Sequence, residues 1–282
     1  MIVAGFMLLA VGAADLVRRF APRRWVGYLV VVVILLLLGS VSDALLPMLA
    51  GLLVGALWVW CMPSERPAPI GFWPAVLLGA ASIGAVVWLG ARTDAGLIGS
   101  VWTLRSPFGD VSFDLAMLTL GAAVFLLESS NLVVRAALDG EHTWRPVELR
   151  PTSPEREIAH GVAAEPRPFA DADRGPIPET THVGVDPVES TDTDRGAPDP
   201  RTDFKGGRLI GPLERILVML LTLAAAYPIL AAMLAAKGIV RFPEISRDGE
   251  TGARAEYFLV GSLVSWVIGL GAAFLVWWAA HS

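Results

Sequence analysis

The sequence predicts an all-α polytopic membrane protein, a bundle of about seven transmembrane helices with a long disordered cytoplasmic tether. Three observations lead to this fold class, and two of them concern composition. The 282 residues are 54% hydrophobic and only 17% charged, whereas about a quarter of the residues in a soluble domain are charged. The charges are also concentrated, because the segment 138–205 holds fifteen of the 27 acidic residues. The rest of the chain has too few charges to cover a water-soluble globule.

The third observation is that apolar runs long enough to cross a bilayer, roughly 20 residues, recur along the chain. We expect transmembrane helices at 2–17, 25–41, 44–62, 71–90, 112–134, 209–236 and 256–278. The first run has four arginines behind it, no basic residue ahead of it and no small-residue cleavage site, which predicts an uncleaved anchor. Between the fourth and fifth runs, two short stretches flank the turn-like SPFGD and predict a small hairpin within 91–110.

Residues 138–205 differ from the rest of the chain. They contain ten prolines and hardly any apolar periodicity, so this segment cannot bury enough apolar surface to fold, and we expect it to be disordered. The chain therefore divides into a five-span membrane body at 1–137, a tether at 138–205 and a two-span C-terminal helical hairpin at 206–282. The tether is either a passive linker, which we favour, or a docking or phosphorylation segment that uses the acid-flanked Ser190, Thr191 and Thr193.

The basic residues predict the orientation in the membrane. The short loop at 18–24 carries four arginines, and such loops stay in the cytoplasm. Alternation over seven spans then places the N-terminus outside and the C-terminus inside. The basic residues of 237–255 do not fit the rule that basic loops stay in the cytoplasm, because this arrangement puts them outside. In an alternative arrangement, Pro228 breaks the sixth run into a re-entrant pair, which returns 237–255 to the cytoplasm.

Other features narrow the class of protein. Twenty arginines beside two lysines, with abundant Ala and Gly, are typical of a high-GC bacterial genome, so we expect a location in the bacterial cytoplasmic (inner) membrane. The single cysteine, Cys61, excludes an intramolecular disulfide and a cysteine-rich metal site. The sequence contains no nucleophile, metal or phosphate-loop motif, so we expect no cofactor and no enzymatic activity. The lack of a basic stripe with interleaved aromatic residues speaks against nucleic-acid binding.

Small residues at four-residue spacing predict close helix packing, because they let two backbones approach each other in a membrane. They occur in three pairs and one longer stripe: Gly51 with Gly55, Ala80 with Gly84, Ala231 with Ala235, and Gly261, Ser265, Gly269 and Ala273. Packing within one bundle is the favoured interpretation. A homo-oligomer formed through these helix faces is the alternative.

The most informative pattern is a polar face along the fifth run. Asp114, Gly121, Glu128 and Arg135 follow one another at intervals of seven residues, and Asn131 lies near the same line on an α-helix. An ionisable side chain is expensive to place in hydrocarbon, so Glu128 must face the bundle interior or water and needs a partner.

The sixth run offers that partner, because Arg208 and Arg215 lie on one of its faces. We expect them at the same depth as Glu128 on the cytoplasmic side, since Arg135 and Arg208 flank the tether. We expect an ion pair between Glu128 and Arg215, or between Glu128 and Arg135 on its own helix. The candidate intramembrane polar face thus contains Asp114, Glu128, Asn131, Arg135, Arg208 and Arg215. A structural pair that holds two helices in register is favoured over a substrate or proton site.

The segment 206–278 reads GGRLIGPLERILVMLLTLAAAYPILAAMLAAKGIVRFPEIS and, further on, AEYFLVGSLVSWVIGL. It resembles the C-terminal helix pair of a family of uncharacterised bacterial multi-pass membrane proteins. The positions that carry the resemblance are Gly207, Arg208, Gly211, Glu214, Arg215, Lys237, Arg241, Phe242, Glu256, Tyr257 and Gly261. Gly238 stands where the pattern has serine. The family has no activity to carry over, so the resemblance implies only the membrane class and marks these charged positions.

Two function classes follow from these patterns. The first is a non-enzymatic scaffold or regulator that acts through protein contacts, in the bilayer or through the tether. The alternative is a small-solute or ion transporter with an intramembrane site around Glu128. The five-plus-two layout and the lack of an internal repeat speak against a transporter, because many secondary carriers are built from repeats.

Overall fold

The computed structural model describes residues 1–63, 71–90, 92, 96–106, 109–140, 207–246 and 253–282. All of them belong to one compact unit, which contains both ends of the chain. Helices dominate this unit, so the predicted all-α class is confirmed. The predicted disorder of the tether concerns residues that lie outside the described ranges, apart from the short helical part at 138–140.

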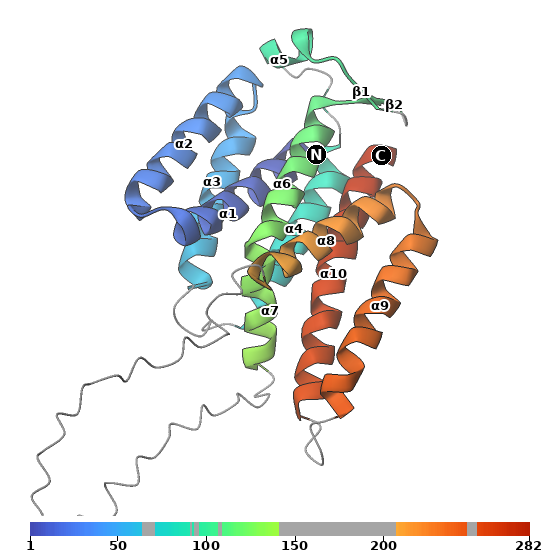
Figure 1. Cartoon of the computed structure of the whole chain (residues 1–282). Coiled ribbons are helices and arrows are strands. Elements are labelled where there is room, and N and C mark those ends of the chain that lie inside the picture. The colour runs from blue at the N-terminus through green and yellow to red at the C-terminus, as the bar shows by residue number, and fades with distance from the viewer. Residues whose placement is uncertain (64–70, 91, 93–95, 107–108, 141–206, 247–252) are drawn as a thin grey trace, which may run out of the picture. The chain divides into compact units, whose positions relative to one another are not determined.

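Ten helices and one pair of strands make up the described residues (Figure 1). In chain order they are α1 (Ile2–Phe20), α2 (Arg24–Val41), α3 (Leu45–Cys61), α4 (Trp73–Leu89), α5 (Gly96–Val101), β1 (Leu104–Ser106), β2 (Gly109–Val111), α6 (Phe113–Leu127), α7 (Ser129–Gly140), α8 (Gly207–Leu223), α9 (Tyr227–Ser246) and α10 (Ala253–His281). β1 and β2 pair antiparallel with Leu104 opposite Val111, which confirms the predicted hairpin.

α1 is the central helix, and α3 and α6 lie against it at very short range. A Cβ atom added at Gly121 of α6 would lie 2.5 Å from the carbonyl oxygen of Gly5 in α1. In the contact between α3 and α1, a Cβ added at Gly51 of α3 would lie 2.8 Å from the backbone of Phe6. The Gly51–Gly55 step therefore packs within the bundle, as predicted, because small residues allow this backbone contact.

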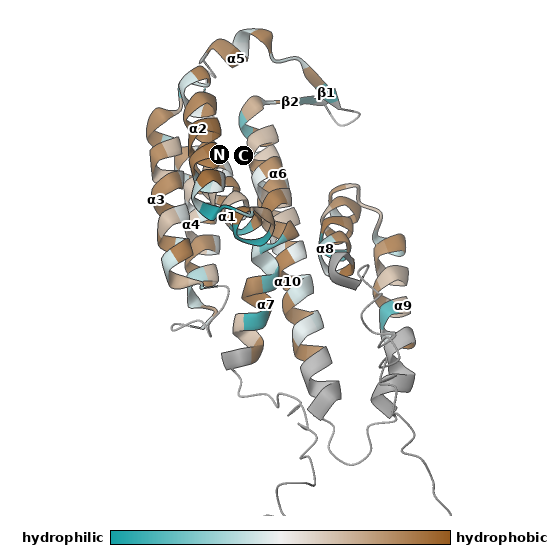
Figure 2. Cartoon of the chain, turned by 60° about the vertical axis from the view of Figure 1, so that its left-hand side comes forward, coloured by the Kyte–Doolittle hydropathy of each residue, from teal (hydrophilic) through white to brown (hydrophobic). Residues whose placement is uncertain are grey.

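The outward faces of the helices are strongly apolar. Leu46, Leu53 and Trp60 of α3 expose 79%, 72% and 78% of their surface, and Figure 2 shows hydrophobic colour over most of α2, α3 and α4. Exposed apolar surface on this scale marks contact with a membrane or a protein partner.

Among the described helices, Arg24–Val41 and Leu259–His281 are each long and apolar enough to cross a bilayer. The bent pair α6–α7 makes a third candidate if it counts as one span, whereas α3 and α4 are apolar but shorter. The chain is therefore mostly helical and has two or three candidate membrane spans by this measure. The seven spans remain a prediction.

The single helix predicted at 209–236 is wrong. The chain forms α8 and α9 there, separated by a turn in which Ala225 has a φ of 54°. Pro228 lies in the first turn of α9, where its missing N–H is not needed for helix formation. Lys237 of α9 lies beside Glu214 of α8, with 2.7 Å between Nζ and the carboxylate. α8 and α9 thus form an antiparallel hairpin, with the break at 224–226 just before Pro228. The predicted return of 237–255 to the cytoplasm stays a prediction.

α10 runs antiparallel to α7. A Cβ at Gly261 would lie 3.6 Å from Leu138 near the end of α7, whereas Ser265 lies close to Ser130 at its beginning, because both bind Arg215. The C-terminal end of α10 therefore lies at the same end of the bundle as the start of α1 (Figure 1). This direction disagrees with the predicted placement of the two termini on opposite sides. It also packs α10 against α4, α6 and α7, within one unit with the predicted five-span body.

Candidate functional site

A break between α6 and α7 organises the buried polar side chains. α6 ends at Leu127 and α7 begins at Ser129, with an angle of 50° between the two helices. The sequence at the break is Glu128-Ser129-Ser130-Asn131. The Ser130 hydroxyl donates to the carbonyl of Leu126 at 2.7 Å, and such side-chain bonds to the preceding turn bend helices. The predicted continuous helix over 112–134 is thus interrupted where its polar residues gather.

Glu128 points to α1. Its Oε1 atom lies 2.8 Å from Nη1 of Arg19, and its other oxygen lies 3.4 Å from the amide of Asn131. The side chain of Glu128 is 14% exposed and that of Arg19 is 33% exposed, so the pair is partly shielded from solvent. The predicted pair between Glu128 and Arg215 is wrong, since no ion pair joins them within the described part of the chain. The alternative pair with Arg135 is not formed there either.

Arg215 of α8 is 5% exposed and binds three side-chain oxygen atoms of other helices. Its Nη1 atom donates to Ser130 Oγ at 2.7 Å and to Asn131 Oδ1 at 2.6 Å, both on α7. Its Nε atom donates to Ser265 Oγ on α10 at 2.8 Å. One guanidinium group therefore links α7, α8 and α10, because its fixed fork of donors can serve several acceptors at once.

A second buried group lies on the α1 side of the break. Asp15 is 1% exposed, accepts a hydrogen bond from Trp58 Nε1 at 2.8 Å and lies 3.3 Å from Nη1 of Arg18. Arg18 also donates to the carbonyl of Met62 at 2.6 Å. Three buried atoms, Asp15 Oδ1, Arg18 Nη2 and Ser129 Oγ, have no hydrogen-bond partner among the described residues. Buried polar atoms are normally satisfied, so this spot has room for a further polar interaction.

We call this assembly the polar junction. It consists of Asp15, Arg18, Arg19, Trp58, Glu128, Ser129, Ser130, Asn131, Arg215 and Ser265. In Figure 2, hydrophilic colour appears where α1 meets α7, within an otherwise hydrophobic bundle. The polar junction is the candidate functional site of the chain.

The other predicted residues of the polar face lie outside the polar junction. Asp114, at the beginning of α6, forms a two-point ion pair with Arg92, at 2.9 and 3.1 Å. Arg92 also donates to the carbonyls of Ser42 and Asp43, so it joins the α2–α3 turn to α6. Arg135 is exposed on α7. The side chain of Arg208 lies outside the described residues, although its backbone belongs to α8. The predicted face is thus divided between two separate polar sites, one at the beginning of α6 and one at the break between α6 and α7.

A third polar group joins α8, α9 and α10. Glu214 accepts from Lys237 at 2.7 Å on both oxygens and from Trp266 Nε1 at 2.9 Å. Glu214 and Lys237 were singled out by the resemblance, whereas Trp266 was missed. Asp15 was also missed, although a carboxylate inside an apolar run is a signal of a buried site.

Comparison of the chain with models of protein families, with curated proteins and with solved structures finds no match. The resemblance of 206–278 to a family of membrane proteins therefore stays a prediction. Within the described ranges, no three His, Cys, Asp or Glu side chains lie close enough together to hold a metal ion.

Exchanging Glu128 tests the ion pair with Arg19. We expect Glu128→Gln to lower the free energy of unfolding by about 1–2 kcal/mol, because the pair lies between an exposed one, worth about 0–1, and a buried one, whose breakage costs about 3–5. Adding Arg19→Gln should recover part of this loss, because no charge is then left unpaired. Thermal and denaturant unfolding in detergent measure both effects.

The double variant of Glu128→Gln with Arg105→Gln is the matched control. Its two effects should add, because Arg105 pairs with Asp110 in the β1–β2 hairpin and shares no partner with Glu128. Coupling of Glu128 to Arg105 as strong as its coupling to Arg19 would contradict the structure.

Proposed function

We propose that this chain is a non-enzymatic scaffold or regulator in the bacterial cytoplasmic membrane and that it acts through contacts with other proteins. The observation that carries the proposal is the pairing in the polar junction. Glu128 binds Arg19, and Arg215 binds three oxygens on two neighbouring helices. Charged side chains that are bound by groups of neighbouring helices fix the register of those helices. Binding within the protein favours a stable scaffold over a site that exchanges solutes.

The proposal includes a revised orientation, with both termini outside. The direction of α10 and the α8–α9 hairpin support it, because both place the ends of α7 and α9 at the end of the bundle that holds Arg18 and Arg19. The basic residues of 237–254 then join those of 18–24 on the inner side. Only Arg92 and Arg105 stay outside, which fits the positive-inside rule better than the predicted alternation does.

Cysteine labelling checks this orientation. Single cysteines at Ser100 and at Ser282, in a Cys61→Ser background, should react with a membrane-impermeant maleimide from the same side. A cysteine at Ser153, outside the described residues, should react from the opposite side only. Vesicles of both orientations give the measurement. Reaction of the Ser282 and Ser153 positions from one side would restore the predicted seven-span alternation.

Neighbour labelling in the native membrane tests the scaffold role. With the labelling enzyme inserted within 160–203, we expect a small reproducible set of proteins that an unrelated multi-pass protein with the same insertion does not label. A second chain, with the acidic residues of 160–203 replaced by serine, separates partners of the tether from partners of the helices. A labelled set equal to that of the unrelated protein would contradict a scaffold.

The alternative is a transporter, and one observation favours it. The break at Glu128 lies beside three buried polar atoms that make no hydrogen bond among the described residues, and transporter sites often lie at broken helices. In proteoliposomes with an internal pH dye, a proton flux that Asp15→Asn abolishes without lowering the melting temperature would support this alternative. The scaffold proposal expects no such flux.

A further inference from the structure

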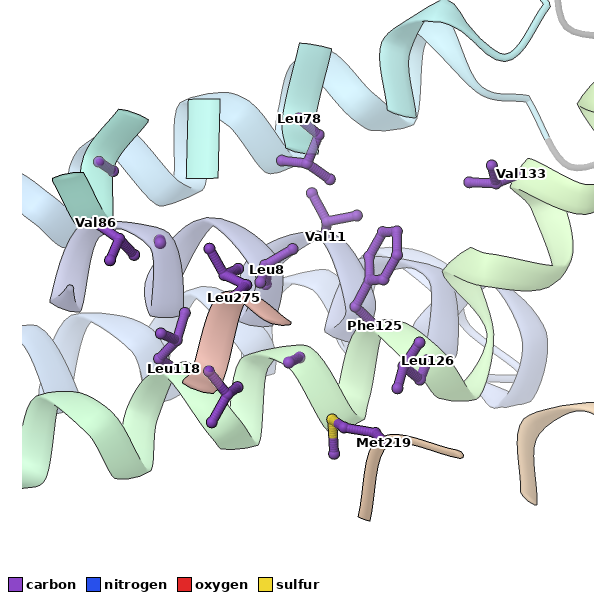
Figure 3. Packing of buried hydrophobic residues seen from close by; sticks show 14 of the residues in the cluster. Leu8, Val11, Leu78, Val86, Leu118, Phe125, Leu126, Val133, Met219 and Leu275 are labelled. Atoms are coloured by element: carbon purple, nitrogen blue, oxygen red, sulfur yellow. The ribbon is translucent and has the colours of Figure 1, made fainter. Parts of the chain in front are cut away.

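An apolar groove of about 520 Å³ runs between α4 and α10. α1, α6 and α7 form its floor, which includes Leu8 and Phe125, and both residues are less than a tenth exposed. Figure 3 shows the floor, with the ring of Phe125 directed from α6 toward α4 and with Leu78 of α4 above Val11. The volume is within the range of about 300–1,000 Å³ for small-molecule sites.

The groove is open along its side. Val76 and Ile83 on α4 expose 45% and 47% of their surface, and Leu263 on α10 exposes 60%. The α10 wall extends from Val260 to Leu275, which is about 22 Å at the helical rise. This wall belongs to Leu259–His281, a candidate membrane span. A long apolar molecule can therefore enter from the lipid and lie along the groove.

One polar side chain interrupts the apolar lining. Ser82 of α4 is 1% exposed, lines the groove, and its hydroxyl has no hydrogen-bond partner in the part of the chain that the structure describes. Leaving such a hydroxyl unpaired costs free energy, because the hydroxyl has lost its hydrogen bonds to water and has gained none in the protein. A ligand that supplies an acceptor at this point would remove that cost.

The depth of Ser82 restricts the ligand. Ser82 lies near the middle of α4, about 10–14 Å along the axis from either end. The ester carbonyls of phospholipids lie at the edge of the hydrocarbon core, so at this depth their chains offer only methylene groups. The acceptor must belong to a lipophile that carries it within an apolar body.

We propose that this groove binds a lipophilic molecule with a carbonyl oxygen in its apolar body, the chemistry of a quinone with a hydrocarbon tail, and that Ser82 donates a hydrogen bond to this oxygen. The tail fills the groove between α4 and α10. The proposal does not depend on the scaffold role, and the site is separate from the polar junction.

The test uses the full chain in nanodiscs of one phosphatidylcholine and two probes, a decyl-substituted benzoquinone and decylbenzene. We expect the quinone to raise the melting temperature and to bind wild type about three- to tenfold more tightly than Ser82→Ala, the effect of one neutral hydrogen bond. Decylbenzene should bind both chains equally. Ser82→Ala alone should not lower the melting temperature, because its hydroxyl has no partner.

A filled groove gives the second comparison. Gly271 lies in the groove and Gly238 lies on α9 outside it, and a Cβ at either position would meet nothing within 4 Å. Gly271→Leu should abolish the quinone-induced shift, and Gly238→Leu should keep it. Equal binding of the quinone by Gly271→Leu and wild type would overturn the groove as the site. Equal binding of both probes, unchanged in Ser82→Ala, would overturn the carbonyl and leave a site for any hydrocarbon chain.

Discussion

Replacing Arg215 by alanine is expected to lower the free energy of unfolding in detergent by about 3 kcal/mol, because hydrogen bonds to a charged group contribute about 1.5–3 kcal/mol each and are not additive. Ser265 and Asn131 lose their charged donor, and the truncated side chain leaves a void between α7, α8 and α10. The desolvation of the guanidinium opposes this loss, since a buried charge is costly in itself. Three good hydrogen bonds outweigh that cost.

Two further variants make this prediction specific. Arg105 also forms an ion pair, with Asp110 at 3.7 Å, but both side chains are 88% exposed, so Arg105→Ala should change stability by less than about 0.5 kcal/mol. Arg215→Lys should recover only part of the loss, because one ammonium group does not reproduce the fork of a guanidinium. Denaturant titrations of the three variants give the comparison. A loss for Arg215→Ala no greater than that for Arg105→Ala would show that Arg215 does not hold the helices together.

The apolar runs predicted where most helices lie, because burial in lipid requires long stretches without charge. They could not predict where a helix breaks within a run. The interruption at 128 depends on the hydrogen bond of Ser130 to the preceding turn, and the turn at 224–226 depends on Ala225 in a left-handed conformation. Neither feature changes the hydropathy of the run, so the sixth run read as one helix.

The partners of the charged residues were harder to predict than the residues themselves. Spacing along one helix shows which side chains share a face, but it says nothing of which helix covers that face. The spacing thus singles out Glu128 and predicts a pair with Arg215 of α8, whereas α1 lies against Glu128 and supplies Arg19. Asp15 could have been found from its charge alone, since it stands within an apolar run.

Gly121 shows a related limit. It falls on the predicted line of polar residues along the fifth run. Its use is different, because the backbone of Gly5 in α1 occupies the place of its missing side chain. Sequence spacing alone does not distinguish a glycine at a close helix contact from a glycine on a polar face, because the distinction depends on which helix lies beside it.

Enlarging Gly121 is the other change with a large expected effect. An alanine Cβ would lie 2.5 Å from the Gly5 carbonyl oxygen and 3.1 Å from the backbone nitrogen of Leu9, and backbone atoms cannot rotate away as a side chain does. α1 must then move away from α6, and overpacking of this kind costs about 1–3 kcal/mol. We expect Gly121→Ala to lose about 2 kcal/mol on this scale, and Gly121→Leu to prevent α1 from docking on α6 at all.

Gly79→Ala is the matched control, because Gly79 also lies within a helix but a Cβ there would meet nothing within 4 Å. Alanine is the better helix former by about 0.8–1 kcal/mol, so the control variant should gain stability while Gly121→Ala loses it. Unfolding in mixed micelles, with the yield of monodisperse protein as the measure for Gly121→Leu, checks both directions. The opposite signs matter more than the magnitudes, since the two substitutions are chemically identical. If Gly121→Ala were stabilised as much as Gly79→Ala, the backbone contact between α1 and α6 would have to be abandoned.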